Sequence, residues 1–356
     1  MKMTGAKMVV ESLHQEGVEV VFGYPGGAIM NVYDEIYKQN YFQHILNRHE
    51  QASIIAAEGY ARATGKVGVS IVTSGPGFTN AVTGLADAYM DSIPLVVISG
   101  QVPTTIIGSD GFQEIDAVGI SRPCTKHNYL VNKIEDLPRI IKEAFHIAST
   151  GRPGPVHVDI PKDITAQVAE FIYPSEINLP TYKPTVNYNK KQLKRAMEAI
   201  SNAKKPLLYV GGGAVLSNCA FEIRELAKKL NIPAVETLMA RGVMGDENPL
   251  FFGMLGMHGE FAANMAAHET DLLISLGARF DDRVTGRLDE FASKAKVIHV
   301  DIDPTSIAKL VVPDYPIVGD LKVTVKAMIE AIESGENEFN DYTNWVELLR
   351  DYREKE

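Results

Sequence analysis

Short apolar runs, each followed by a glycine- or proline-rich loop and then a helical pattern, recur along the whole sequence. Val67–Thr73 and Pro94–Ser99 are such runs in the first half, and Pro206–Val210 and Leu272–Leu276 are such runs in the second half. Runs that are almost wholly apolar are typical of strands buried on both faces of a parallel sheet. Strands and helices that alternate at this spacing place helices on both faces of the sheet. The sequence therefore predicts an α/β protein with doubly wound parallel sheets.

A stretch rich in Pro, Tyr and Asn, residues 171–189, interrupts this alternation and has no clear periodicity. Stretches of this kind commonly link domains. The chain has 356 residues, which is enough for two ordinary domains. We therefore expect two consecutive doubly wound domains, over residues 1–170 and 190–335, joined by this linker.

Composition limits the kinds of partner and the compartment. The formal net charge is −10 and no run of Lys or Arg stands out, which argues against nucleic acid or an anionic membrane as a partner. No apolar stretch approaches the roughly 20 residues of a membrane span, and the N-terminal residues do not have the pattern of a secretory signal. The two cysteines, Cys124 and Cys219, are far apart in the sequence and are predicted to be buried thiols. These features predict a cytoplasmic protein.

The loops that follow the strands of the first domain carry the first candidate site residues. In parallel sheets, ligands bind at the carboxyl ends of the strands. Glu50 lies at such a junction, between the apolar pair Ile45-Leu46 and an alanine-rich helix. Glu50 is therefore a candidate for chemistry, and a first-turn acid favoured by the helix dipole is the alternative explanation.

The second domain has two features that suit a nucleotide. The triplet Gly211–Gly213 follows a strand and precedes a helix, where backbone N–H groups can bind phosphate. The triplet does not have the full dinucleotide spacing, and a tight turn is the alternative. Asp301 and Asp303 end another strand and can accept from ribose hydroxyls, or can cap a helix that starts at Pro304.

Several long motifs resemble one family. Residues 49–51 with 56–65 (HEQ and AAEGYARATG), 74–80 (SGPGFTN), 93–103 (IPLVVISGQVP) and 151–163 (GRPGPVHVDIPKD) resemble thiamine-diphosphate-dependent carboligases and decarboxylases. Three further motifs resemble the catalytic subunits of acetohydroxyacid (acetolactate) synthases: DGFQE at 110–114, MLGMHG at 254–259 and GARFDDRVTG at 277–286. The resemblance covers nearly the whole chain.

The resemblance implies a pyrimidine-binding domain over residues 1–170 and a central FAD-binding domain over residues 190–335. It gives Glu50 the task of sharing a proton with the aminopyrimidine ring of thiamine diphosphate and stabilising its imino tautomer. The cofactor supplies the difficult chemistry, and the protein supplies orientation and proton control. The implied reaction decarboxylates pyruvate and joins the two-carbon unit to a second 2-oxo acid, pyruvate or 2-oxobutyrate. This is the first common step of valine, leucine and isoleucine biosynthesis.

Other site residues of the first domain are carried over one by one. Gly26 and Gly27 match a loop near the reacting carbon, where glycine lets a backbone N–H approach a developing oxyanion, although a plain turn is the alternative. Pro76 and Asn80 match the loop against the aminopyrimidine. Phe112 and Gln113 match residues that line the substrate approach and reach the cofactor, and Lys162 matches a lysine at the mouth of the active site. A solvated surface lysine is the alternative for Lys162.

The implied FAD site takes most of its residues from the second domain. The flavin has no net redox task in the reaction, and the RFDDRVTG stretch distinguishes biosynthetic enzymes from catabolic ones that lack FAD. The residues that match flavin-binding positions are Arg152, Gly211, Gly212, Gly213, Thr237, Leu238, Met239, Leu255, Gly256, Met257, His258, Gly277, Ala278, Arg279, Asp281, Arg283, Val284, Asp301, Ile302, Asp320 and Leu321.

Members of the family have a third domain, whose Gly-Asp-Gly sequence and asparagines hold Mg²⁺ and the cofactor's diphosphate. This sequence contains no Gly-Asp-Gly, so no metal ligand is predicted in it. Residues 336–356 resemble the start of the linker to that domain, and we expect the chain to correspond to the first two-thirds of the enzyme, inactive alone. The resemblance also implies a homodimer or tetramer with a small regulatory subunit.

Two alternatives keep the resemblance but change the function. The chain can be a fragment of a catalytic subunit, or it can be a non-catalytic FAD-binding subunit or half of a split thiamine-diphosphate enzyme. Among related enzymes, the RFDDRVTG stretch and Lys162 argue against oxalyl-CoA decarboxylase and pyruvate oxidase. Glyoxylate carboligase lacks the glutamate, so Glu50 argues against it.

Overall fold

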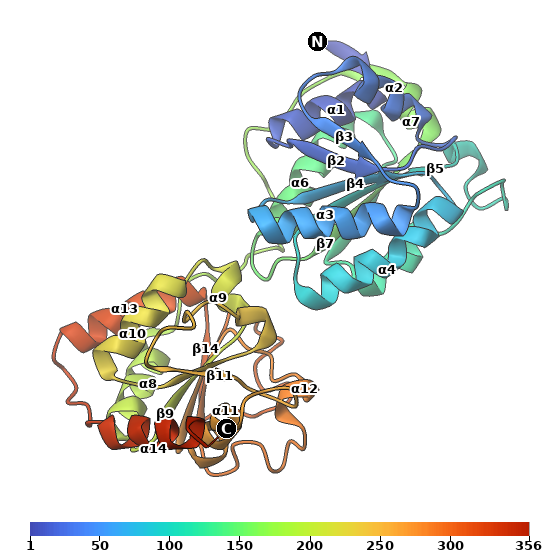
Figure 1. Ribbon diagram of the computed structural model, residues 1–356. Helices are drawn as coiled ribbons and strands as arrows, with labels where there is room; N and C mark the ends of the chain where they lie inside the picture. Colours follow the sequence, from blue (N-terminus) through green and yellow to red (C-terminus); the bar gives the residue numbers. More distant parts are fainter. Residues whose placement is uncertain (356) are drawn as a thin grey trace. The chain divides into compact units, whose positions relative to one another are not determined.

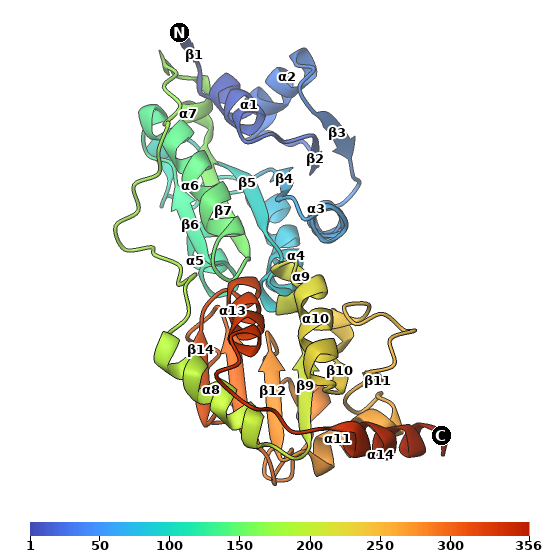
Figure 2. The same ribbon diagram turned by 90° about the vertical axis from the view of Figure 1, so that its left-hand side faces the viewer.

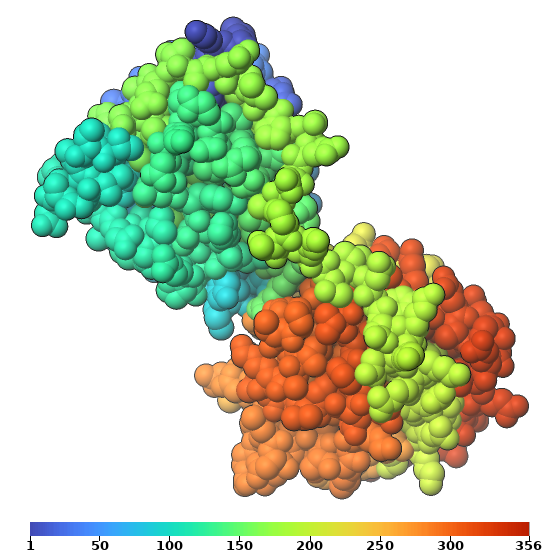
Figure 3. Space-filling model, turned by 180° about the vertical axis from the view of Figure 1, so that it is seen from behind, coloured from blue at the N-terminus to red at the C-terminus, as the bar shows by residue number. Residues whose placement is uncertain are grey.

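The computed structural model describes residues 1–355, whose contacts divide the chain into two compact units with the boundary between Lys183 and Pro184. The boundary falls within the stretch 171–189 that the sequence predicts as a linker. Residues 171–183 lie along the surface of the first unit (Figure 3), where the Tyr182 hydroxyl donates to the carbonyl of Thr150 over 2.8 Å. Part of the predicted linker is therefore packed against the first unit.

The first unit is built on a six-stranded sheet in which every neighbouring pair of strands is parallel (Figure 1). In spatial order the strands are β3 (Gln43–Leu46), β2 (Val20–Gly23), β4 (Gly68–Val72), β5 (Leu95–Gln101), β7 (Pro155–Pro161) and β6 (His127–Leu130). Strands β4, β5 and β7 are buried along their whole length, as their apolar runs predict.

Helices cover both faces of this sheet. They are α1 (Gly5–Gln15), α2 (Met30–Lys38), α3 (Glu50–Thr64), α4 (Pro76–Asp91), α5 (Ala117–Ser121), α6 (Leu137–Ser149) and α7 (Lys162–Ala166). One core cluster joins α1, α2 and α6 to the sheet, and another joins α3 and α4 to it. Ile98 belongs to the first cluster and Val97 to the second, because successive side chains of a strand point to opposite faces. The predicted doubly wound arrangement is confirmed.

A short antiparallel pair joins the beginning and the end of the first unit. Strand β1 (Lys2–Thr4) pairs with β8 (Val168–Glu170), with Met3 opposite Ala169. The backbone N–H of Gly5 continues the pairing and donates to the carbonyl of Gln167 over 3.0 Å. No pattern in the sequence indicates this pair, because three-residue strands are too short to show alternation.

The second unit has the same architecture on its own six-stranded parallel sheet (Figure 2). In spatial order the strands are β11 (Phe251–Met254), β10 (Ala234–Glu236), β9 (Pro206–Val210), β12 (Leu272–Leu276), β13 (Lys296–Asp301) and β14 (Tyr315–Val318). The helices are α8 (Lys190–Asn202), α9 (Gly213–Leu216), α10 (Ala220–Leu230), α11 (Phe261–Glu269), α12 (Asp282–Thr285), α13 (Leu321–Glu333) and α14 (Thr343–Arg353).

Helix α14 lies in the range 336–356 that was expected to begin a linker. Within the second unit, α14 packs against α11 and β11. Trp345 is buried, and its indole N–H donates to the carbonyl of Pro206 over 2.9 Å. The preceding Tyr342 is also buried and donates to the carbonyl of Ile200 over 2.7 Å. Residues 342–353 are therefore part of the core of this unit. Across the described residues 1–355, the helices are all too short or too polar to cross a membrane.

Candidate active site

The first unit has a topological switch point between β2 and β4. The chain leaves β2 toward β3 on one side and leaves β4 toward β5 on the other, so the loops after β2 and β4 diverge at the carboxyl edge of the sheet. The two loops touch, because the backbone N–H of Ala28 donates to Thr73 Oγ1 over 3.3 Å. A Cβ on Gly26 would lie 2.5 Å from the Thr73 side chain, whereas one on Gly27 would meet nothing within 4 Å. Gly26 is thus needed for close packing, and Gly27 lies exposed at the edge.

Glu50 and Asn80 meet beside this switch point. Glu50 is the first residue of α3 and is 7% exposed, and its Oε2 accepts a hydrogen bond of 3.0 Å from Asn80 Nδ2 on α4. The side chain of His49, rather than that of Glu50, caps α3 by accepting from the backbone N–H of Gln51. Asn80 bonds only one of the two carboxylate oxygens, and among the described residues no donor bonds the other oxygen, Glu50 Oε1. The carboxylate is therefore held by α4 and does not serve as a helix cap.

Tyr33 and His44 lie behind Glu50, and the sequence did not single out either residue. The Tyr33 hydroxyl donates to the carbonyl of Ile71 on β4 over 2.8 Å. Burial is the main cause that raises the pKa of Tyr33, and the negative charge of Glu50 raises it further. His44 meets the Tyr33 ring edge-on with the centroids 5.2 Å apart, and burial lowers the pKa of His44. A tyrosine within a helix and a histidine within a short strand carry no sequence signal that they lie behind Glu50.

The segment from Pro103 to Asp116 brings Gln113 to the start of α4. Gln113 has a positive φ of 60° and rests on Gly75, where a Cβ would lie 2.6 Å from the Gln113 carbonyl oxygen. Gly75 precedes Pro76, which is exposed at the first position of α4. Phe112 is 89% exposed. The structure thus brings Gln113 and Pro76 together, and it leaves the Phe112 ring in solvent.

Lys162 and Arg152 lie on different edges of the first unit. Lys162 is exposed at the start of α7, directly after the carboxyl end of β7, so it shares the edge at which Glu50 lies. Arg152 precedes β7, and its Nε donates to Ser92 Oγ over 2.7 Å at the other end of α4. Within the first unit, Arg152 therefore lies at the amino edge of the sheet, opposite to the other candidates.

The second unit has its own switch point, between β9 and β12. The glycine triplet after β9 packs directly on Gly277 after β12, because a Cβ on Gly211 would lie 2.3 Å from the Gly277 carbonyl oxygen. The backbone N–H of Gly213 donates to the same oxygen over 3.1 Å. Gly212 faces Met239, with 3.0 Å from its ideal Cβ to Met239 Cβ. Close packing against the backbone of Gly277 explains why residues 211 and 213 are glycines. The triplet also joins two loops that the sequence predicts to bind flavin.

Two more predicted flavin segments, 255–258 and 279–284, contact each other. The backbone N–H of Met257 donates to the carbonyl of Arg283 over 2.9 Å. Gly256 has a φ of 120°, and the Asn264 side chain bonds both its N–H and its carbonyl at 3.1 Å. Met257 and His258 are exposed beside this contact. In the other segment, Asp281 caps α12 by accepting from the Arg283 N–H over 3.0 Å.

The acidic candidates at the ends of β13 and β14 already have structural partners. Asp301 is buried, and its Oδ1 accepts from the Asp303 N–H over 2.9 Å. Residues 304–308 form turns, so the alternative that Asp301 and Asp303 cap a helix is wrong; Asp303 instead accepts from the Thr305 N–H. Asp320 caps α13 by accepting from the Val323 N–H over 2.9 Å. All predicted flavin positions except Arg152 nevertheless lie after strands, at the carboxyl edge of one sheet.

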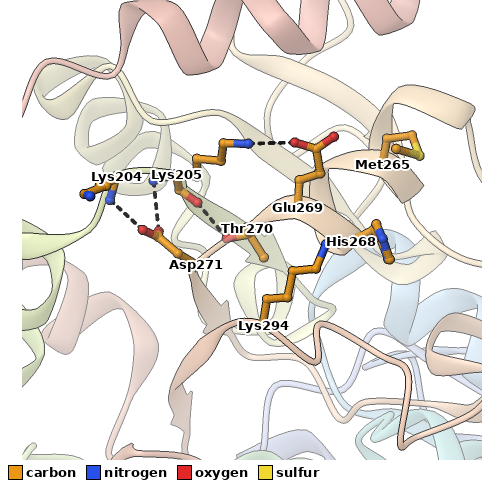
Figure 4. Close-up of a pocket in the computed structure, with 8 residues that line it drawn as sticks. All are labelled: Lys204, Lys205, Met265, His268, Glu269, Thr270, Asp271 and Lys294. Atoms are coloured by element: carbon orange, nitrogen blue, oxygen red, sulfur yellow. Dashed lines mark hydrogen bonds and ion pairs between the residues drawn. The ribbon is translucent and has the colours of Figure 1, made fainter.

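A cavity of about 500 Å³ lies elsewhere in the second unit (Figure 4). It is lined by Lys204, Lys205, Met265, His268, Glu269, Thr270, Asp271 and Lys294. Lys205 Nζ lies 2.6 Å from Glu269 Oε2, and the backbone N–H groups of Lys204 and Lys205 donate to Asp271. These residues precede β9 and β12, so the cavity opens at the amino edge and is not the candidate site.

Both units match models of known protein families. Residues 3–120 match the family model described as thiamine pyrophosphate enzyme, N-terminal TPP binding domain, and residues 193–328 match thiamine pyrophosphate enzyme, central domain. The chain is 50% identical, over 99% of its length, to an acetolactate synthase large subunit of Haemophilus influenzae and covers 62% of that protein. It is 48% identical, over 99% of its length, to the acetolactate synthase isozyme 3 large subunit of Escherichia coli and covers 62% of it. It is 51% identical, over 98% of its length, to an acetolactate synthase of Mycobacterium leprae and covers 56% of it. The chain thus spans about three-fifths of the length of these relatives.

Proposed function

This chain belongs to the family of thiamine pyrophosphate enzymes, and on that premise we propose that it supplies the pyrimidine-binding and central domains of an acetolactate synthase large subunit. The observation that carries the proposal is the buried Glu50 carboxylate, held by Asn80 at a switch point within the part of the chain that matches the TPP binding domain. The sequence similarity to acetolactate synthase large subunits supports this reaction within the family. A non-catalytic FAD-binding subunit, or half of a split enzyme, is not favoured by that similarity.

The residues around Glu50 suit an aminopyrimidine ring. Glu50 Oε2 is occupied by Asn80, and Oε1 is left to bond a ring nitrogen. When bound, thiamine diphosphate supplies the carbon nucleophile and the electron sink for loss of CO₂ from pyruvate. Glu50 exchanges a proton with the ring, and Asn80 keeps its carboxylate in the orientation for that exchange. Gly27, Phe112, Gln113 and Lys162 are proposed to line the approach of pyruvate and of the second 2-oxo acid, pyruvate or 2-oxobutyrate.

We propose that FAD binds at the carboxyl edge of the second sheet. The close packing of Gly211 and Gly277 brings two strand-end loops together, as a site for an extended dinucleotide requires. Arg279 and Arg283 carry the positive charge that a pyrophosphate needs. No ligand for Mg²⁺ is proposed in this chain. In the acidic group Glu58, Asp87 and Asp91, two members instead pair with Arg62, whose guanidinium lies 2.6 Å from Glu58 and 2.5 Å from Asp91.

The relatives are named large subunits, so we also propose a homodimer or tetramer of this chain together with a small regulatory subunit. A cytoplasmic location follows from the same proposal.

Replacing Glu50 by Gln tests the function directly. In the full-length protein supplied with thiamine diphosphate, Mg²⁺ and FAD, wild type should convert pyruvate to acetolactate. Glu50→Gln should fold normally and lose turnover by about 10²- to 10⁴-fold, because an amide cannot exchange the proton. Glu58→Gln, on the same helix but bonded to Arg62, is the matched control and should keep most activity. Near-normal turnover by Glu50→Gln would exclude the proton-exchange role of Glu50.

A further inference from the structure

Four polar side chains are buried together on one face of the first sheet. Ser99 and Gln101 lie on β5, and His157 and Asp159 lie on the neighbouring β7, with exposed fractions of at most 4%. The ring of Phe78 on α4 stacks on His157, with centroids 4.4 Å apart and an interplanar angle of 23°. None of these four residues has a part in the proposed chemistry, and buried polar groups of this kind need an explanation.

Hydrogen bonds connect Asp159 to Gln101. Asp159 Oδ2 accepts from Gln101 Nε2 over 2.9 Å, and Asp159 Oδ1 lies 2.5 Å from Ser99 Oγ. The same amide nitrogen of Gln101 donates over 2.9 Å to the carbonyl of Ile115. The amide oxygen of Gln101 accepts from the Val102 N–H over 2.8 Å. Both amide hydrogens and the amide oxygen of Gln101 are therefore used.

Ile115 lies near the end of the segment that carries Phe112 and Gln113. At the beginning of this segment, Thr104 donates from its N–H and its hydroxyl to Asp163, over 2.9 and 2.6 Å. At the end, the Gln101 amide ties the Ile115 carbonyl to the sheet. Between the two ties, the backbone of Gln113 rests on Gly75 at the start of α4.

We propose that Asp159 is a positioning residue that orients the Gln101 amide, so that Gln101 holds the segment from Pro103 to Asp116 against Gly75 and keeps Phe112 and Gln113 at the active site. The placement of the segment stands on the contacts alone, and its importance for turnover rests on the proposed function.

The network keeps the bond between Asp159 and Gln101 in either protonation state of Asp159. Burial raises the pKa of Asp159 to about 7, and the nearby charge of Asp116 adds to this, while burial lowers the pKa of His157 to about 3. When Asp159 is ionised, Ser99 donates to its Oδ1. When it is neutral, Oδ1 donates to Ser99, and Ser99 donates to His157 Nε2, which lies 2.7 Å away. Oδ2 accepts from Gln101 in both cases, so an asparagine can take the place of Asp159.

Hydrogen–deuterium exchange on the full-length protein tests the positioning. Amides of residues 104–116 should exchange about tenfold faster in Asp159→Leu, because the amide of Gln101 loses its partner. Gln101→Leu should give the same increase and decides alone if Asp159→Leu does not fold. Asp159→Asn should behave like wild type. Glu143→Gln changes another buried carboxylate of the same unit, bonded to Arg139 and Tyr129, and should leave residues 104–116 unchanged. Wild-type exchange of this segment in folded Gln101→Leu would overturn the proposal.

Steady-state kinetics distinguishes positioning from a loss of folded protein. Asp159→Leu should raise KM for pyruvate about tenfold or more with a smaller fall in kcat, because the displaced segment lines the substrate approach. A simple loss of folded enzyme would lower kcat at constant KM, and Asp159→Asn should restore KM. If the leucine variants exchange faster but even the wild type forms no acetolactate, the proposed function is wrong and the positioning role of Asp159 stands. If acetolactate forms but amide exchange is unchanged in both leucine variants, the proposed function stands and the positioning role of Asp159 is wrong.

Discussion

Single atoms decide how closely the loops of the first unit approach each other. Gly26 and Gly27 are adjacent, but only at Gly26 would a side chain collide with Thr73. A Cβ added to Gly26 would lie 2.5 Å from Thr73 Cβ. The backbone N–H of Ala28 then reaches Thr73 Oγ1. Thr73 is therefore the support on which the loop after β2 lies, and a neighbouring glycine is free of that constraint.

Gly26→Ala should disturb this loop. The added methyl group must displace Thr73 or the loop, which costs about 1–3 kcal/mol of unfolding free energy. It should also lower turnover by at least about tenfold, because a small misplacement of groups at a reaction centre is expensive. Urea unfolding and an acetolactate assay measure the two effects. Gly27→Ala is the control for stability alone, because its methyl group meets nothing within 4 Å. Equal unfolding midpoints for the two variants would contradict the packing argument.

His299 should make the second unit sensitive to acid. It is buried, its Nε2 bonds the carbonyl of Ala278 over 3.0 Å, and its Nδ1 has no partner among the described residues. Burial lowers its pKa to about 4. Well above pH 6.5 the residue is neutral in both the folded and the unfolded states and has no effect on the pH dependence of stability. As the pH falls from about 6.5 toward 4, the unfolded state binds the proton first, so stability falls, by up to about 3 kcal/mol.

Urea unfolding between pH 4 and 7 checks this expectation. The comparison is with His299→Gln, which keeps a donor for the Ala278 carbonyl but cannot be protonated. The difference between the two proteins should grow toward low pH, because other titrating groups are common to both. A constant difference would show that His299 takes up its proton equally in the folded state.

The contacts of Asp159 and Gln101 could not be predicted from the sequence, whereas the place of Glu50 at a strand–helix junction could. Glu50 lies in a long local motif at a strand–helix junction, so its place can be read from neighbouring residues. Asp159 meets Gln101 only through the pairing of β5 with β7, and Gln101 meets Ile115 across a loop. One local signal was present: His157 and Asp159 alternate within an otherwise apolar run, which is unusual for a buried strand.

At the scale of elements, the sequence predicted the central strands and one edge strand, at Ile45-Leu46 in β3, and missed the edge strands β6, β11 and β14. The first four residues of β5, Leu95–Ile98, are all apolar and β12 has four apolar residues of five, because neighbouring strands and helices bury them. Strand β6 is at an edge, contains His127 and Asn128, and is only partly buried. Strand β14 is also at an edge and includes Pro316, which breaks the pattern of a strand. The apolar run that identifies a strand is a consequence of burial, and β6 and β14 are not buried enough to show it.

Trp345→Ala should destabilise the second unit. The indole is buried against the core and donates to Pro206, at the first residue of β9. Its removal leaves a cavity and an unpaired carbonyl, with an expected loss of about 3–5 kcal/mol of unfolding free energy. Trp345→Phe keeps most of the packing and should lose less. Circular dichroism during urea unfolding measures both. If Trp345→Ala is as stable as wild type, α14 does not contribute to the stability of the second unit.

At the scale of the molecule, each unit has its own sheet and its own core, so each presents one edge of strand-end loops. FAD should bind to the second unit, giving flavin absorbance on the purified protein or a higher melting temperature with added FAD, because a ligand of the folded state stabilises it. Arg279→Ala should weaken FAD binding by about tenfold or more through loss of a charge-assisted contact.

Arg287→Ala is the matched control for this FAD titration. Arg287 lies eight positions further along and pairs with Asp289 and Glu290 on the surface. Its replacement should leave FAD affinity unchanged. Equal affinities of the two variants would remove Arg279 from the proposed flavin site, and a protein that shows neither absorbance nor stabilisation at high FAD would remove the site itself.

The pairing of β1 with β8 has a consequence for synthesis of the protein on the ribosome. Met3 lies opposite Ala169, so β1 must remain unpaired until almost the whole first unit has been made. Contacts between residues so distant in sequence form slowly, because a long loop must close first. The nascent first unit therefore passes through a period with an open edge, in which chaperones can bind it, and it closes only while the second unit is being translated.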